Sequence, residues 1–493
     1  MKQSVDLHEL IQSMSKNEKR YFILNSSFQK GNKIYLELFK ILERQKIYDE
    51  EAIKEKYKDR NFIRHFAFNK NHLYGLVMKS LISYGNQNNI DGIIHSLISE
   101  CMILFRKGLY KRYFRTIAKA KLAAIKHERY GYLIQLLDME KIIIPKEEIQ
   151  KNKINEIFSE AKGAAESVLN LFEYSRLAGN LLNKFRYFGL NRDESHSRVI
   201  DEITGTDIMS SPSKAKSIRA LEAYYRVREL SAIAKADNEM AYDSLLKRNE
   251  IVQKNPEPFE NYIIHYPSDI LYSLTESCIS LGKLDDAEKF LNDIKFYSPK
   301  YNSDKEDIDT YSGYAKLRIL LKRGLVSNAA KLIPHLERSL KKYENKMLID
   351  TDLSIRYYIV RCRIEEKNFQ KALKAANELM HHPYISKRSD YECYIKILNL
   401  IIHFELENYS LLKYLIISTY RFLYKREKLF KVEQLILEFI RKLPEVKNND
   451  DLKFMFSLFG KKLSRLRNDK YEKNAFEYFD ILKWAESKAK EMR

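Results

Sequence analysis

The sequence predicts an all-α protein built from stacked helical hairpins. Four segments of the same pattern align without a gap, at residues 281–287, 323–329, 366–372 and 406–412. Their last residues lie 42, 43 and 40 positions apart (287 to 329 to 372 to 412), a period typical of stacked hairpins. With only 14 Gly and 9 Pro, the chain has few residues to form the many tight turns that a many-stranded fold needs. Its 493 residues exceed one compact core, but hairpins that pack only on their neighbours can reach that length.

The first 95 residues show no clear repeat and predict a helical head. Ser15 followed by Glu18 forms a capping box, in which each side chain accepts a hydrogen bond from a free backbone N–H, so a helix should begin at Lys16. Further helices are expected at residues 33–45, 49–57 and 61–84. The Gly- and Asn-rich residues 85–89 should then break the chain.

The middle of the chain predicts hairpins and one irregular stretch. Hairpins are expected over residues 91–144, followed by a long helix from about Ile154 to Leu182. Residues 191–216 are rich in short polar residues and contain Pro212, a composition that favours turns, so we expect a mobile, irregular loop there.

In the repeat region, each aligned segment reads as the turn of a hairpin. Gly282 and Gly324 can adopt the left-handed conformation that ends one helix, and Asp285 or Ser327 can cap the next. The small residue that ends each segment should let two helices approach closely. Apolar residues then follow at four and seven positions, which is the spacing of a buried helical stripe: Leu291, Ile294, Ile333, Leu336, Ala376, Leu379, Ile416 and Thr419.

The C-terminal region predicts a linker and a cap. Residues 444–451 should connect to two last helices, and the charged segment 470–493 suits a cap because a terminal repeat needs a polar outer face. We therefore expect a helical head over 1–95, a helical-repeat superhelix over 96–443 with the irregular loop at 191–216, and C-terminal capping helices over 444–493.

The repeat region resembles the tetratricopeptide repeat. The best copy spans 271–299 and carries small, apolar and terminal proline residues at the family's spacing: Leu274, Gly282, Leu284, Ala287, Leu291, Ile294 and Pro299. The likeness covers roughly residues 95 to 425 in degenerate copies, with a period longer than the family's ~34. It implies a right-handed α-solenoid of antiparallel helical hairpins that binds a protein or peptide on its concave face. Residues 15–22 also resemble the start of a group of bacterial helical proteins of no known activity.

Signatures of catalysis and metal binding are missing from the sequence. It contains no glycine-rich phosphate loop, no His-Glu-x-x-His and no paired cysteines at zinc spacing. His65 and His72 stand seven residues apart, about 10 Å along a helix, and His381 and His382 form a loop pair. We therefore expect ordinary histidines, no enzymatic activity, no cofactor and no metal.

The sequence also predicts a cytoplasmic protein. The first residues lack the apolar core of a signal peptide, and no stretch approaches the ~18 uncharged apolar residues of a membrane span. The four cysteines, Cys101, Cys278, Cys362 and Cys393, are far apart in helical apolar patterns. They are expected to be buried, reduced thiols.

Positive charge gathers in the N-terminal quarter. Residues 1–130 hold 25 Lys and Arg against 13 Asp and Glu, so they carry +12 of the formal +20. After Gly108, Lys111, Arg115 and Lys119 recur every four residues on one helix face, with Arg112 and Lys126 beside them. Charges about 6 Å apart could follow a phosphate backbone or an acidic peptide. The same pattern is also typical of a solvated helix face in a basic protein.

The head offers a second, weaker nucleic-acid signal. A helix-turn-helix could form from the helix at 49–57, the turn at 58–60 and the following helix. Its side chains of the kinds that contact bases or phosphates would be Arg64, Asn69, Lys70 and Asn71, with His65 and His72 alongside. Any helical hairpin with a basic second helix looks similar, so a capping or docking role stays open.

Together these observations favour a non-catalytic cytoplasmic scaffold that binds a protein or peptide. The alternative is a nucleic-acid-binding regulator that uses the basic head and first hairpins. An enzyme is the least expected class.

Overall fold

In the computed structural model every regular element of the described residues is helical, and these residues contain no strand. The description covers residues 5–27, 33–142, 152–260, 266–294, 302–343, 347–443, 446 and 448–491. The chain divides into two compact units. The first comprises residues 1–169, 255–266 and 297–308, and the second comprises 170–254, 267–296 and 309–493.

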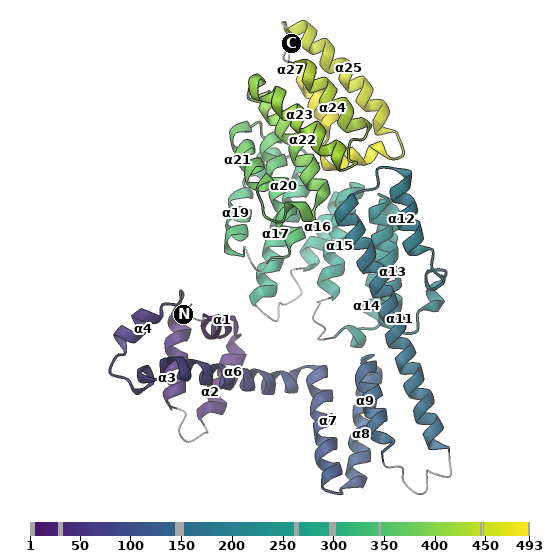
Figure 1. The fold of residues 1–493 in the computed structure, drawn as a ribbon. Coiled ribbons are helices and arrows are strands. Elements are labelled where there is room, and N and C mark those ends of the chain that lie inside the picture. The colour runs from purple at the N-terminus through teal and green to yellow at the C-terminus, as the bar shows by residue number, and fades with distance from the viewer. Residues whose placement is uncertain are drawn as a thin grey trace. The chain divides into compact units, whose positions relative to one another are not determined.

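The first unit consists of a head and a set of consecutive antiparallel helices (Figure 1). Its helices are α1 (Asp6–Ser13), α2 (Lys16–Ser27), α3 (Lys33–Arg44), α4 (Glu50–Lys56), α5 (Asn61–Arg64), α6 (Phe66–Asn88), α7 (Ile90–Arg106), α8 (Tyr110–Lys126), α9 (Tyr130–Glu140), the first half of α11 (Lys153–Phe188) and the 3-10 turn η3 (Glu257–Phe259). The head has its own core, in which Phe22, Phe39 and Phe62 are almost fully buried. The capping box is confirmed, because the Ser15 amide donates to Glu18 Oε2 (2.7 Å) and the Glu18 amide donates to Ser15 Oγ (3.3 Å).

Two helix boundaries in the head correct the sequence prediction. The helix expected over 61–84 is interrupted at His65, so α5 is a single turn and α6 begins at Phe66. The break expected at 85–89 is confirmed only at its last residue, since α6 continues to Asn88, and Asn89 ends it and caps α7. A Cβ on Gly92 would lie 2.4 Å from the Asn86 backbone, so this glycine permits the close turn between the two helices.

The second unit packs consecutive helices against one another over most of its length. After the second half of α11 come α12 (Glu194–Thr204), η1 (Asp207–Met209), η2 (Pro212–Lys214), α13 (Ile218–Ala234), α14 (Asn238–Lys254), α15 (Tyr266–Leu281), α16 (Leu284–Ile294), α17 (Asn302–Lys322), α18 (Val326–Ala330), α19 (Ile333–Lys342), α20 (Ile349–Glu365), α21 (Phe369–Met380), η4 (Ile385–Lys387), α22 (Ser389–Glu405), α23 (Tyr409–Lys425), α24 (Lys431–Lys442), α25 (Asn449–Arg467), η6 (Glu472–Asn474), α26 (Ala475–Tyr478) and α27 (Ile481–Glu491). The start of α17 belongs to the first unit by the division above.

The register of the repeat is confirmed by burial. The four residues that end the aligned segments, Ala287, Ala329, Ala372 and Leu412, are all fully buried. The residues four and seven positions later are buried as well, as the helical stripe predicts. The predicted caps are wrong, because Asp285 and Ser327 lie inside the first turns of α16 and α18 instead of before them.

The hairpin turns share one backbone geometry. At the aligned position Gly282, Gly324, Lys367 and Glu407 all adopt a left-handed conformation, with φ between 58° and 75°. In each turn the next amide donates to the carbonyl five residues earlier at 2.9 Å, which is the Schellman arrangement that closes a helix. The amide of the left-handed residue itself donates to the carbonyl three residues earlier. The same two hydrogen bonds recur in four further turns of the described chain, at Gly108, Glu128, Ala236 and Glu427. The turn geometry therefore extends beyond the residues that the sequence pattern aligns.

The stretch 191–216 is more regular than the loop expected from the sequence, although irregular residues remain in its second half. It contains helix α12 and the turns η1 and η2. The Asn170 side chain donates to the Lys214 carbonyl and accepts from the Lys216 amide, and the Tyr174 hydroxyl donates to the Ile208 carbonyl at 2.8 Å. The short polar residues serve as caps and turn formers within a packed segment.

The C-terminal segment is also packed in a different way from the one expected. Residues 470–491 form no single charged helix, because η6, α26 and α27 follow one another with breaks. Phe476, Ile481 and Trp484 are buried in the main core of the second unit. The Trp484 indole N–H donates to Glu405 at 2.7 Å. This segment therefore contributes core residues in addition to a polar outer face.

All four cysteines are buried and unpaired, as predicted. Burial raises the pKa of the Cys101 and Cys278 thiols to about 11 and that of Cys362 and Cys393 to about 12. None of the described helices combines the length and hydrophobicity that a membrane span requires.

Candidate functional site

The predicted basic stripe lies on the solvent face of α8. Lys111, Arg112, Arg115 and Lys119 are exposed, and within the described chain no carboxylate lies within ion-pair distance of any of them. Tyr113 and Ile117, on the other side of the helix, are buried. The hydroxyl of Tyr113 donates to the Met139 carbonyl at 2.6 Å. The structure therefore places these four cations together on one accessible surface.

The other lysines of α8 are engaged with carboxylates. Lys126, the fifth predicted contact, lies 3.4 Å from Glu257. Lys121 bridges Glu140 and Glu160 at 2.8 Å each, and although its burial opposes the shift, the two carboxylates raise its pKa. Lys121 and Lys126 therefore have carboxylate partners, whereas the four exposed cations of α8 have none among the described residues.

The predicted contacts in the head fall into two groups. Arg64 and Asn71 are exposed. Lys70 is half-buried and forms an ion pair with Glu50, and it also donates to the Tyr48 hydroxyl. The side-chain amide of Asn69 donates to the Phe62 carbonyl at 2.9 Å. Asn69 and Lys70 thus hold the head together, and the structure does not gather the four residues on one free face.

Two of the histidines that the sequence singles out have local partners. Phe68 stacks on His72, and His382 lies 3.5 Å from Asp352. Across the described residues no group of three or more His, Cys, Asp or Glu side chains is arranged to hold a metal ion.

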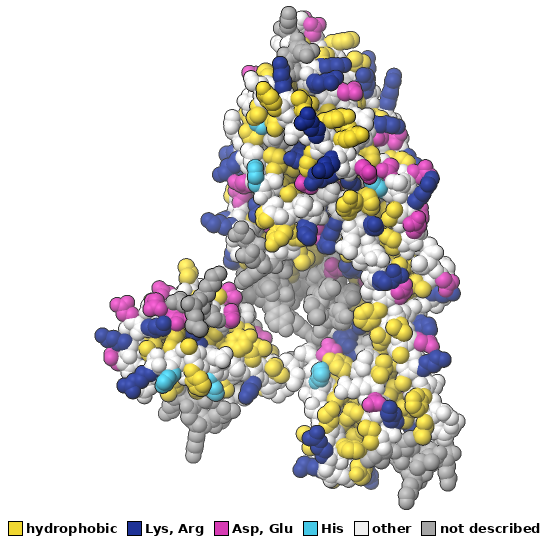
Figure 2. Space-filling model, in the orientation of Figure 1, with side chains coloured by type: hydrophobic (Ala, Val, Ile, Leu, Met, Phe, Trp, Pro, Cys, Tyr) yellow, Lys and Arg dark blue, Asp and Glu magenta, His cyan; other side chains and the backbone are white. Residues whose placement is uncertain are grey.

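A third surface, on α23, was missed by the sequence analysis. Tyr414, Ile417 and Tyr424 are 75%, 53% and 68% exposed, on the side of α23 opposite its buried stripe. Figure 2 shows hydrophobic side chains interspersed with Lys and Arg over this part of the second unit. Every charged residue between Tyr409 and Lys425 is a cation: Lys413, Arg421 and Lys425. The described chain contains no ion pair to these three cations.

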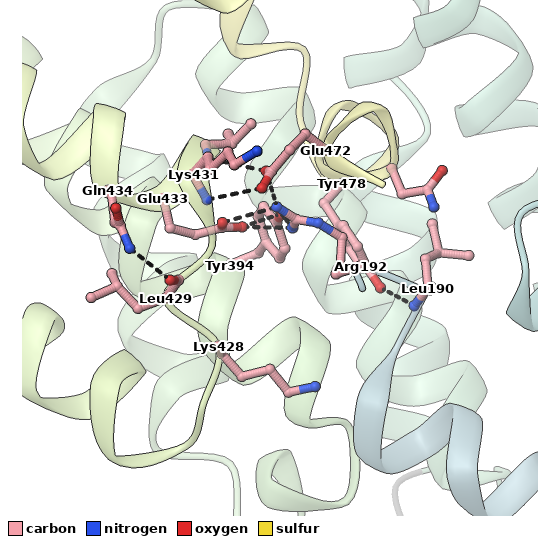
Figure 3. Close-up of polar contacts among 12 residues, drawn as sticks. Leu190, Arg192, Tyr394, Lys428, Leu429, Lys431, Glu433, Gln434, Glu472 and Tyr478 are labelled. Carbon is pink, nitrogen blue, oxygen red and sulfur yellow. Dashed lines mark hydrogen bonds and ion pairs between the residues drawn. The ribbon is translucent and has the colours of Figure 1, made fainter. Parts of the chain in front are cut away.

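A groove continues this surface beyond the end of α23. It has a volume of about 550 Å³ and is lined by Tyr420, Tyr424, Lys425, Glu427, Leu429, Phe430 and Gln434. One of its lining residues, Glu427, is the left-handed residue of a Schellman turn, with a φ of 56°. The Gln434 side chain crosses the turn and donates to the Leu429 carbonyl at 3.1 Å (Figure 3). The volume is in the range of sites that accept a small ligand or one or two large side chains.

Beneath the groove, a buried ionic cluster fixes the start of α24 (Figure 3). Arg192 donates to both oxygens of Glu433, to the Tyr394 hydroxyl and to Glu472 at 2.6–2.9 Å. Glu472 in turn accepts from the first two amides of α24, at Lys431 and Val432. Its negative charge lies where the helix dipole is positive. Burial opposes the shift, but these carboxylates and Tyr394 raise the pKa of Arg192 well above its ordinary value.

Lys428 leaves the same turn toward the interior. Its ammonium donates to the Phe188 carbonyl at 2.8 Å and lies over the Phe188 ring. Burial lowers its pKa below the ordinary value, although nearby Cys393 and Asp390 oppose the shift. Buried interactions therefore hold the backbone on two sides of the groove.

Comparison with models of known protein families and with curated proteins finds no match to this chain.

Proposed function

We propose that this chain is a non-catalytic helical-repeat scaffold that binds a protein or peptide partner. The observation that carries the proposal is the recurrence of one Schellman turn, which joins consecutive helices in eight places among the described residues of the two units. A repeated turn of this kind produces stacked helix pairs, each of which leaves one face exposed for recognition. We take the arrangement of these pairs to be a tetratricopeptide-like right-handed solenoid.

The cellular setting belongs to the same proposal. We place the scaffold in the cytoplasm, where its four thiols stay reduced. Partner binding through an extended helical surface needs no reactive group, so we expect no catalytic turnover.

A capture experiment tests this proposal. The tagged full chain is crosslinked in source cells and purified with and without nuclease, and the bound proteins are identified by mass spectrometry. We expect a defined partner protein whose recovery survives nuclease treatment. Untagged chain added in excess before crosslinking should reduce that recovery, because it competes with the tagged chain for the partner. Recovery of nothing beyond nucleic acid and its attached proteins would overturn the scaffold function.

A second candidate function, nucleic-acid binding, is favoured by the four exposed cations of α8. Changing Lys111, Arg115 and Lys119 to Gln should weaken binding to DNA or RNA of any sequence and reduce the salt slope by up to about three, because each lost phosphate contact removes roughly one released counterion. Filter binding over a salt series measures this slope, with Lys126→Gln as the matched control because Lys126 is paired with Glu257. An unchanged slope in the triple variant would remove this candidate.

A further inference from the structure

We infer that the exposed face of α23 docks an amphipathic helix of a partner protein whose flanking positions are acidic. This inference rests on the scaffold function proposed above and assigns its docking surface and the chemistry of its partner. The face comprises Lys413, Tyr414, Ile417, Tyr420, Arg421, Tyr424 and Lys425, and it leads into the groove at the end of the helix.

The chain itself provides the comparison that makes this face unusual. Two positions after the buried residue of each aligned segment, the four copies have Lys289, Lys331, Lys374 and Tyr414, and all four side chains are exposed, although Lys331 lies in the turn between α18 and α19. Five positions after it the copies have Asn292, Pro334, Asn377 and Ile417, again all exposed. Only the fourth copy places a large aromatic and a large aliphatic residue at these solvent positions. Apolar residues that gather at one exposed place mark an interaction surface.

The spacing of the exposed residues indicates a helical partner. Tyr414, Ile417, Arg421 and Tyr424 follow one another at three or four positions, so their side chains form a row along α23. The opposite side of α23 uses the same spacing, at Leu412, Ile416, Thr419 and Leu423, for its buried stripe. A helix with two such stripes can pack on a neighbour on each side, and ridges spaced this way interdigitate with those of another helix.

The charge of the face selects an acidic partner. Lys413, Arg421 and Lys425 extend over about 18 Å of α23 without an intervening carboxylate. Acidic side chains that flank an apolar stripe would pair with these cations and leave Tyr414 and Ile417 to the stripe itself. A second copy of α23 is disfavoured, since a two-fold contact would bring the same cations together.

The aromatic rings also favour a peptide over a nucleic acid. Tyr420 and Tyr424 lie nearly parallel to one another, with ring centroids 6.0 Å apart and an angle of 9° between the planes. The cations are unevenly spaced, about 12 Å from Lys413 to Arg421 and about 6 Å from there to Lys425, and Ile417 lies between them. A row of rings interrupted by an aliphatic residue matches apolar side chains better than a run of stacked bases.

A designed peptide tests the inference. The probe is a fluorescein-labelled synthetic helix of about 18 residues, with Leu every third or fourth position and Glu on both flanks, and anisotropy is measured against the full chain. A second peptide replaces every Glu with Lys. We expect the acidic helix to bind at least about tenfold more tightly than the basic one.

Two variants and one control locate the contact. Tyr414→Lys with Ile417→Asn gives α23 the residue types of α21, and it should weaken binding at least about tenfold while circular dichroism and the melting temperature stay unchanged. Lys413→Glu with Arg421→Glu should reverse the preference toward the basic helix. Lys374→Ala, at the equivalent position of α21, is the matched control and should leave the affinity unchanged.

Several results would overturn the inference. These are equal affinity for the acidic and basic helices, wild-type affinity in the Tyr414→Lys, Ile417→Asn variant, tighter binding of a labelled single-stranded oligonucleotide at this face, or a wild-type dimer in sedimentation that this variant abolishes. If that variant still captures the cellular partner, the assigned surface is wrong and the scaffold function stands. If the wild-type chain captures no protein partner, the scaffold function itself fails.

Discussion

A left-handed residue at the end of a helix is the conformation on which the hairpins of this chain depend. Glycine occupies it at Gly108, Gly282 and Gly324, whereas Glu128, Ala236, Lys367, Glu407 and Glu427 adopt it with a side chain. For residues other than glycine this conformation costs about 1–2 kcal/mol. The hydrogen bonds that close each helix and the packing of the following helix offset that cost.

Exchanging residues at two of these turns should change stability in opposite directions. A Cβ on Gly282 would meet no atom within 4 Å, so Gly282→Ala should destabilise through backbone strain alone, by about 1 kcal/mol. Glu407→Gly should relieve the corresponding strain and stabilise by up to about 1 kcal/mol. Chemical denaturation of both variants measures the two changes. Equal signs would show that strain does not dominate at these turns.

The ion pair between Glu50 and Lys70 predicts a dependence of stability on pH. Burial alone would raise the pKa of Glu50, but hydrogen bonds from Lys70, Tyr48 and Lys54 lower it from 4.5 to about 2. Because the folded-state pKa lies below the unfolded value, the stabilisation is present above pH 4.5 and is lost as the pH falls toward 2.

Glu50→Gln isolates this contribution. The variant should lose roughly 1–2 kcal/mol of unfolding free energy at pH 7, a value reduced by solvent screening near the surface. The difference from wild type should shrink between pH 4.5 and 2. Chemical denaturation at pH 7 and pH 3 gives both values, and a difference that does not depend on pH would contradict the assignment.

At the scale of elements, the repeat could be predicted because local pattern and tertiary packing agree there. Glycine, a small residue and an apolar stripe stand in a fixed order, and Ala287, Ala329 and Ala372 are all buried as that order requires. The details that the pattern missed depend on packing geometry. The α6–α7 turn depends on the close approach of Gly92 to the Asn86 backbone, which is nearby in sequence, whereas the segment after Gly189 depends on the buried pairing of Arg192 with Glu433 and Glu472, which are distant in sequence.

The candidate surfaces were predictable to different degrees. The stripe of α8 follows from helical spacing, because three cations at intervals of four residues, with Arg112 beside them, need only an exposed helix face. Asn69 and Lys70 look identical to surface donors in sequence, and their partners come from other parts of the head. The face of α23 was missed because Tyr and Ile residues in a helical pattern usually indicate buried core positions. Comparing Tyr414 and Ile417 with Lys374 and Asn377 was the signal that could have revealed it.

An arginine at Ala287 should unfold part of the second unit. Ala287 is fully buried between helices, so Ala287→Arg would overpack the contact or bury a charge, at a cost of about 3 kcal/mol or more. Lys289→Arg, two residues away on the exposed side of α16, is the control and should be nearly neutral. Thermal unfolding of both variants is the measurement. An unchanged melting temperature for Ala287→Arg would contradict the repeat register.

At the scale of the whole molecule, each of the two compact units carries one of the candidate surfaces. The first unit presents the unpaired cations of α8, and the second presents the apolar and basic face of α23. Each surface belongs to a hairpin that ends in the same Schellman turn. Repetition therefore supplies the framework, and we propose that departures from the repeat at solvent positions supply the recognition.

Hydrogen–deuterium exchange of the full chain, with and without its captured partner, tests the central claim most directly. If the chain is a scaffold that docks an acidic helix on α23, exchange should slow across Tyr409–Lys442 in the complex, and the Tyr414→Lys, Ile417→Asn variant should lose that protection. Protection confined to α8 and removed by nuclease, or no protection in either unit, would contradict the claim.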